Sequence, residues 1–169
     1  MKSRTLRLRI LGCLAVALGL SNFAASADAA TIVALGASNT YGKGVARNQA
    51  FPAQLEAILR AKGSNVRVVN AGINGDTTEG MLRRLDRAVP NGTSAVILQP
   101  GGNDLRKHSP DRTGEIQSRL SARGIAVILL PNNLLKGLPH QPDGQHLTPE
   151  GYHMLAEYMA SQVAGAIGR

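Results

Sequence analysis

The sequence is poor in the residues that characterise several classes of protein. One cysteine among 169 residues excludes a disulfide framework and a zinc site built on cysteine. Tryptophan is absent and aromatic residues amount to 3%, so few side chains could stack on bases or sugar rings. Hydrophobic residues make up 43%, which is too many for a disordered chain, and the length suits one domain. We therefore expect a single globular domain and no nucleic-acid partner.

The first thirty residues have the pattern of a secretory signal peptide. Four basic residues lie within the first ten, the apolar run LGCLAVALGL follows, and small residues then fill SNFAASADAA. The apolar run is about half as long as the roughly 20 residues that span a bilayer, which disfavours an uncleaved membrane anchor. We expect a signal peptide over residues 1–30, with cleavage after Ala27, Ala29 or Ala30. The protein would then be periplasmic or secreted.

Positive charge remains after this segment is set aside. It holds four of the 19 basic and one of the 11 acidic residues, so residues 31–169 keep a net charge of +5. Arg83, Arg84 and Arg87 share one helix face, and Arg106 and Lys107 add charge nearby. Such a face could attract anionic head groups, although an ordinary solvated face is the simpler interpretation. A transient contact with a membrane surface stays open, and the sequence does not specify the oligomeric state.

Apolar runs alternate with helix-like segments along the rest of the chain. The runs are nearly continuous in apolar character, as in strands buried on both faces, and lie at 31–36, 66–72, 94–102 and 124–131. Helices are expected at 51–63, 77–89, 111–124 and 148–168. In the last of these, Thr148 is the expected N-cap and Pro149 the first helical residue. The alternation predicts an α/β domain with a parallel sheet, right-handed crossovers and helices on both faces.

Polar or glycine-rich clusters follow the expected strands, at the sheet edge where open α/β proteins bind ligands. They are GASNT (36–40), NAGINGD (70–76) and GGND (101–104), and DGQH (143–146) precedes the last helix. Each cluster alone has an ordinary explanation as a turn, a strand end or a loop. Their combination at one edge indicates a catalytic site.

The residue types in these clusters suit attack on an ester or thioester carbonyl. Ser38 would be the nucleophile, His146 the general base, and Asp143 the group that orients the imidazole. The oxyanion of the tetrahedral intermediate would be held by the backbone N–H groups of Ser38 and Gly72 and the side-chain amide of Asn103. A glycine at position 72 also allows close backbone approach.

With these motifs the chain resembles the SGNH hydrolases of the GDSL type. The motifs are GASNT (36–40), NAGINGDTTEGMLRRL (70–85), GGND (101–104) and DGQHLTPEGY (143–152). The chain is most similar to the secreted thioesterase-I/lysophospholipase/arylesterase branch. The resemblance implies a flavodoxin-like three-layer α/β/α sandwich with strand order 2-1-3-4, in a single domain over residues 31–169. It also implies serine-dependent hydrolysis of small-molecule or lipid acyl esters or thioesters, with no metal and no organic cofactor.

The chain departs from the family pattern in two places. The family usually has Asp where this chain has Ala37, which predicts a looser serine turn. Only residues 129–142 stand where the family places another helix and a fifth strand, so we expect that strand to be missing, with an exposed edge strand and a reshaped acyl pocket. These departures leave a second hypothesis open, a catalytically weak relative that binds acyl or glycan ligands. His140 and His153 lack metal-ligand spacing with His146, which disfavours a zinc site.

Overall fold

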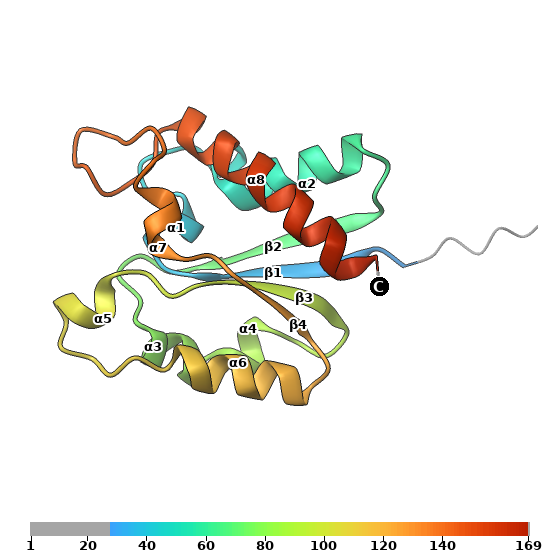
Figure 1. The fold of residues 1–169 in the computed structure, drawn as a ribbon, viewed down its shortest axis with the longest axis horizontal. Coiled ribbons are helices and arrows are strands. Elements are labelled where there is room, and N and C mark those ends of the chain that lie inside the picture. The colour runs from blue at the N-terminus through green and yellow to red at the C-terminus, as the bar shows by residue number, and fades with distance from the viewer. Residues whose placement is uncertain (1–27, 169) are drawn as a thin grey trace, which may run out of the picture.

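A four-stranded parallel sheet forms the centre of the protein, as the computed structural model of residues 28–168 shows (Figure 1). The strands are β1 (Ala30–Gly36), β2 (Val66–Gly72), β3 (Thr93–Gln99) and β4 (Ala126–Leu129). They pair in the order β2-β1-β3-β4, and every pair is parallel. The α/β class and the expected strand order are thereby confirmed. Residues 1–27 of the expected signal peptide lie outside the described residues.

Helices cover both faces of the sheet and make the fold a three-layer sandwich (Figure 1). On one face lie α2 (Phe51–Ala61) and α8 (Pro149–Ile167). On the other face lie α3 (Thr78–Arg83), α4 (Leu85–Ala88) and α6 (Thr113–Ala122). Four short helical turns complete the described chain, namely α1 (Ser38–Tyr41), η1 (Arg47–Gln49), α5 (Asn103–Arg106) and α7 (Asn132–Leu135). Among the described helices, none is both long and apolar enough to span a membrane.

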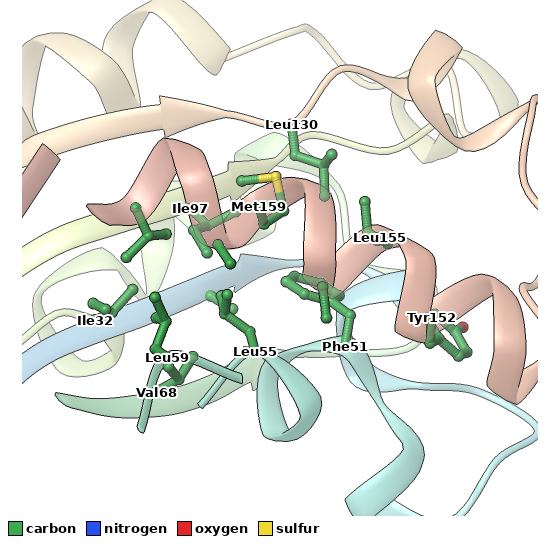
Figure 2. Packing of buried hydrophobic residues seen from close by; sticks show 14 of the residues in the cluster. Ile32, Phe51, Leu55, Leu59, Val68, Ile97, Leu130, Tyr152, Leu155 and Met159 are labelled. Atoms are coloured by element: carbon green, nitrogen blue, oxygen red, sulfur yellow. The ribbon is translucent and has the colours of Figure 1, made fainter. Parts of the chain in front are cut away.

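Strand β1 explains why the apolar runs are continuous rather than alternating. Its side chains point in turn to the two faces, and both faces are covered by helices. Ile32 and Ala34 pack in the cluster beneath α2 and α8, whereas Val33 and Leu35 pack against α3, α4 and α6. Figure 2 shows the first cluster, to which α2 contributes Phe51, Leu55 and Leu59 and α8 contributes Tyr152, Leu155 and Met159.

The expected helix over residues 77–89 is interrupted at Arg84. That residue ends α3 and begins α4, and its side chain turns inward to Asp76, with the two side chains 10% and 12% exposed. Arg84 therefore does not belong to an exposed basic face with Arg83 and Arg87. A charged pair so nearly buried needs the geometry and hydrogen bonds of a specific partner, which helical periodicity alone cannot reveal.

The expected loss of a fifth strand is confirmed for the described chain. Strand β4 forms one edge of the sheet, and Leu129 at its end is 43% exposed. The segment that follows contains the single turn α7 and one isolated antiparallel bridge between His140 and Leu147. This short segment brings the chain from β4 directly to α8, past the carboxyl ends of the strands.

Candidate active site

Ser38 opens α1 immediately after β1, and a buried glutamine holds this turn in place. The N-cap residue, Ala37, offers no side-chain hydrogen bond. Instead, the side-chain oxygen of Gln99, at the end of β3, accepts hydrogen bonds from Ala37 N at 3.2 Å and Thr40 Oγ1 at 3.1 Å. Gln99 is 2% exposed and also donates to Asn132 Oδ1 at 3.3 Å. The serine turn is therefore braced by a neighbouring strand although its own cap residue is alanine.

His146 lies beside Ser38 although 108 positions separate them in the chain. Its Nε2 is 3.0 Å from Ser38 Oγ, and its Nδ1 is 2.5 Å from Asp143 Oδ2. The other carboxylate oxygen of Asp143 accepts the backbone N–H groups of Gln145 and His146 at 2.9 and 3.0 Å. The structure thus brings together the three residues that the sequence singled out for nucleophile, base and orienting group.

The hydrogen bonds at Asp143 also stabilise its ionised form. The bond from the His146 ring, followed by the two backbone N–H bonds, holds the pKa of the Asp143 carboxyl well below its usual value. An ionised carboxylate at Nδ1 favours a proton on that ring nitrogen. Nε2 is then left with its lone pair toward the Ser38 hydroxyl, the arrangement that a general base requires.

Asn39 connects the serine turn to the segment of residues 141–147 that carries His146, here called the histidine loop. Its Nδ2 donates to Gln145 O at 3.0 Å, and its Oδ1 accepts from Tyr152 Oη at 3.0 Å and from Leu147 N at 3.4 Å. The residues on both sides of His146 are therefore bonded to the residue next to Ser38. Sequence reasoning missed this role, although the position of Asn39 beside the serine was an available signal.

Two further side chains hold the histidine loop without the help of a fifth strand. Gln141 Nε2 donates to Lys43 O at 2.8 Å and to Leu147 O at 2.7 Å. Tyr152 is fully buried on α8, and burial raises the pKa of its hydroxyl, which therefore stays protonated and donates to Asn39. The loop is thus anchored to α1, to the segment after it and to α8.

Asn103 reaches the site from α5 with its amide fixed in orientation. Its Nδ2 donates to Asp76 O at 2.7 Å and its Oδ1 accepts from Arg106 Nη2 at 2.6 Å. Together with Ser38, His146 and Gly75, the 5% exposed Asn103 lines a hollow of about 200 Å³. One hydrogen of Nδ2 is not used by Asp76, so the amide keeps a donor for a bound group.

Gly72 does not line this hollow, which differs from the sequence-based expectation. Its N–H donates to Asn70 Oδ1 at 2.9 Å, and a Cβ at this position would lie 2.2 Å from Tyr41 N. Gly72 is therefore a place where β2 packs tightly under α1. Gly75, three residues further on, has φ +72° and lines the hollow, and its N–H has no acceptor among residues 28–168. The turn-forming sequence Asn74-Gly75 was the signal that could have identified it.

A second hollow of about 230 Å³ adjoins the first and shares Ser38, Asn103, Arg106 and His146 with it. Figure 1 shows why these residues meet, since α1, α5 and α7 all lie at the same end of the sheet. Residues 28–168 contain no group of three His, Cys, Asp or Glu side chains arranged to hold a metal ion. The chemistry available here is that of a serine hydroxyl, an imidazole, a carboxylate and amide donors.

Comparisons with known proteins identify the family of this chain. The model of the GDSL-like Lipase/Acylhydrolase family matches residues 34–159. Esterase TesA of Pseudomonas aeruginosa is 34% identical over 129 residues, which are 73% of this chain and 62% of that esterase. The match therefore spans less than two thirds of the relative's length.

Solved structures share the fold. The psychrotrophic esterase EstA from Pseudoalteromonas sp., solved with monoethylphosphonate as inhibitor, superposes with a TM-score of 0.69 at 18% identity, over 82% of this chain and 99% of that one. AlinE4, an SGNH-hydrolase family esterase, superposes with a TM-score of 0.54 at 25% identity, over 83% of this chain and 75% of that one.

Proposed function

The chain belongs to the GDSL-like lipase/acylhydrolase family, and from that premise we propose a secreted serine hydrolase that cleaves acyl esters or thioesters. Ser38, His146 and Asp143 would form its catalytic triad. The single observation that supports this proposal most is the 3.0 Å separation of Ser38 Oγ and His146 Nε2, with Asp143 on the far side of the ring. The family relationship supports hydrolysis of an ester, and this geometry supports the serine mechanism.

In the first half of the reaction, His146 Nε2 accepts the proton of Ser38 as the hydroxyl oxygen attacks the acyl carbonyl carbon. The carbonyl oxygen takes the negative charge of the tetrahedral intermediate. His146 then returns the proton to the leaving alcohol or thiol, and the acyl group stays on Ser38. A water molecule repeats the sequence, with His146 as base, and releases the carboxylic acid. Asp143 stabilises the imidazolium in both halves without accepting its proton.

The oxyanion is stabilised by preoriented donors around Ser38. The backbone N–H of Ser38 and the free hydrogen of Asn103 Nδ2 are two of these donors. We assign the third to the backbone N–H of Gly75 rather than that of Gly72, because Gly75 lines the hollow and its N–H is not otherwise bonded in the described chain. A single donor of this kind is worth roughly 10²–10³ in turnover.

The cellular setting follows from the N-terminal pattern. Residues 1–30 would direct the chain out of the cytoplasm and be removed, which leaves a domain without cysteine in the periplasm or outside the cell. N-terminal sequencing of the exported protein tests this part, since it should begin just after Ala27, Ala29 or Ala30. Full-length protein in the cytoplasm would contradict it.

Labelling with a fluorophosphonate tests the catalytic part of the proposal. Inhibition of the relative EstA by monoethylphosphonate supports the choice of a phosphorus electrophile. Mass spectrometry should map the adduct to Ser38, and the Ser38→Ala variant should remain unlabelled. Hydrolysis of p-nitrophenyl acetate is measured in parallel. If the protein is instead a catalytically weak relative that binds acyl or glycan ligands, wild type and Ser38→Ala will give equal rates.

A further inference from the structure

Among residues 28–168, basic side chains and no acidic one line the two hollows beside Ser38. Arg106 borders both, Lys136 and His140 line the larger, and Lys43 lines the smaller. The remaining polar lining consists of hydroxyl and amide side chains and the imidazole of His146. Asp143, the nearest carboxylate named in the site, lies behind the His146 ring and is bonded to it. A bound substrate therefore meets positive charge at the rim and no negative charge in the lining.

These cations are not neutralised by partners of their own. In the described part of the chain, no carboxylate lies within 4.0 Å of the basic groups of Lys43, Arg106 or Lys136. Arginines elsewhere do have such partners, as Arg84 has Asp76 and Arg119 has Glu115. Unpaired positive charge at the site thus attracts an anion instead of being cancelled within the protein.

Arg106 keeps donors available for such an anion. One nitrogen, Nη2, is bonded to Asn103 Oδ1, and no other hydrogen bond is formed by its guanidinium in residues 28–168. The guanidinium lies close to Gly102, since a Cβ added at that glycine would be 3.4 Å from Arg106 Nη1. A guanidinium has five N–H groups in a planar fork, which suits a carboxylate or a phosphate. Arg106 is therefore placed to bind an anionic group within reach of the oxyanion donor Asn103.

The same hollows offer little space or apolar surface for a long acyl chain. Their volumes are about 230 and 200 Å³, below the range of roughly 300–1,000 Å³ for pockets that enclose drug-sized ligands. Apart from glycines, the apolar residues that line the hollows in the described chain are Ala37 and Leu135, both in the larger one. Burial of a long alkyl chain needs far more apolar surface than these two residues provide. A short acyl group such as acetyl matches the available room.

We propose that the preferred substrate is a short-chain acyl ester whose leaving group carries a carboxylate or phosphate, bound by Arg106 and Lys136 in the larger hollow. This inference rests on the proposed function, since it names the substrate class for the same serine. The anion would orient the ester over Ser38 while the neutral amides of the lining bind its uncharged oxygens. The expected gain is about tenfold in kcat/KM, as for one charge-assisted hydrogen bond, and it decreases with added salt.

Matched pairs of esters test the charge preference. The first pair is 1-acetylglycerol 3-phosphate and 1-acetylglycerol, and the second is 3-acetoxybenzoate and 3-acetoxybenzamide, each rate being corrected for spontaneous hydrolysis. The quantity compared is the ratio of kcat/KM for the anionic and the neutral ester. We expect a ratio of about ten for wild type at low salt. A ratio near one in both pairs overturns the inference but leaves the proposed function intact.

Variants locate the preference. Arg106→Gln and Lys136→Gln should each lower the anionic-to-neutral ratio severalfold, and together they should bring it close to one. The ratio is used because Arg106 also orients Asn103, so its replacement affects both esters. Arg87→Gln is the matched control, because Arg87 lines a separate hollow with Thr31 and Thr93 at the amino ends of β1 and β3. An unchanged ratio in the double variant, or an equal loss in Arg87→Gln, contradicts the assignment.

A further experiment with a lipid substrate distinguishes a soluble anionic ester from a lipid head group. Palmitoylglycerol 3-phosphate in neutral phosphatidylcholine vesicles carries the same phosphate on a long-chain ester. We expect it to be hydrolysed more slowly than the acetyl ester, whereas faster hydrolysis would refute the short-acyl part of the inference. Failure of every ester together with failure of the phosphonate to label Ser38 would overturn the proposed function itself, which is a different result from a ratio of one.

Discussion

The replacement of Asn39 by leucine provides a sharp test of how the site is assembled. Asn39 is bonded to Gln145 and Leu147, the residues on either side of His146, and to the hydroxyl of Tyr152. Leucine has nearly the same size but no hydrogen-bonding atoms. The Asn39→Leu variant therefore removes three of the hydrogen bonds that hold the histidine loop against the serine turn, without creating a large cavity.

The magnitude follows from these three bonds. Each contributes about 0.5–1.5 kcal/mol, and the buried Tyr152 hydroxyl, once unpaired, adds a desolvation cost of about 1–3 kcal/mol. The 3.4 Å bond from Leu147 N is the weakest of the three. Counting the two stronger bonds and this desolvation cost, we expect the free energy of unfolding to decrease by about 2–6 kcal/mol. We also expect kcat/KM to fall, because a displacement of His146 by about 1 Å costs roughly 10²-fold in rate.

The assay combines urea denaturation with kcat/KM on p-nitrophenyl acetate for Asn39→Leu, Tyr152→Phe and the double variant. Tyr152→Phe removes the hydroxyl but leaves the bond from Asn39 to Gln145. The double variant leaves no unpaired hydroxyl, so its loss of stability should be smaller than the sum of the two single losses by about 1 kcal/mol. The activity loss should follow Asn39→Leu and not Tyr152→Phe.

Two outcomes would refute this reasoning. If Asn39→Leu keeps kcat/KM within about twofold of wild type while Ser38→Ala is inactive, the loop is held in register by other contacts. If the losses of stability in the two single variants add fully in the double variant, the tyrosine hydroxyl and the asparagine are not coupled.

Three further predictions concern the packing, the pH dependence and the buried ion pair. Gly72→Ala should lower the free energy of unfolding by about 1–3 kcal/mol in urea denaturation, because its Cβ would overlap the backbone of α1; wild-type stability would contradict the tight packing. Since the pKa of Asp143 is lowered in the folded protein, its stabilising contribution is present above the ordinary Asp value of about 3.9 and is lost as the pH falls through the lower folded value. The difference in stability between wild type and Asp143→Asn, measured by urea denaturation, should therefore decrease as the pH is lowered through that acidic range, and a constant difference there would contradict this linkage. Arg84→Met should lower stability by about 3–5 kcal/mol in the same urea assay, because it leaves Asp76 charged and nearly buried, whereas a loss below 1 kcal/mol would show that the pair is not a main support of the fold.

The strands and the larger helices follow from local properties of the chain. Strand β1, for instance, is a run of apolar residues that ends at Gly36, and α8 begins where Thr148 and Pro149 indicate a start. The Thr148 side chain accepts a hydrogen bond from Gly151 N at 3.1 Å, as an N-cap does. These signals depend on residues within one or two turns of each other, and for that reason they can be read from a sequence.

The class of fold, the order of the elements along the chain and the end of the sheet where Ser38 and His146 lie can be inferred from the amino-acid pattern alone. The fold determines which glycine lines the site, because Gly72 and Gly75 are the same residue type and differ in backbone angle and in the atoms around them. It also decided that Arg84 turns inward to Asp76 while Arg106 remains unpaired in the described chain, since the distance to a carboxylate depends on segments far apart in sequence. Hydrophobic pattern is a local property, whereas hydrogen-bond partners and charge compensation depend on which distant segments the fold brings together.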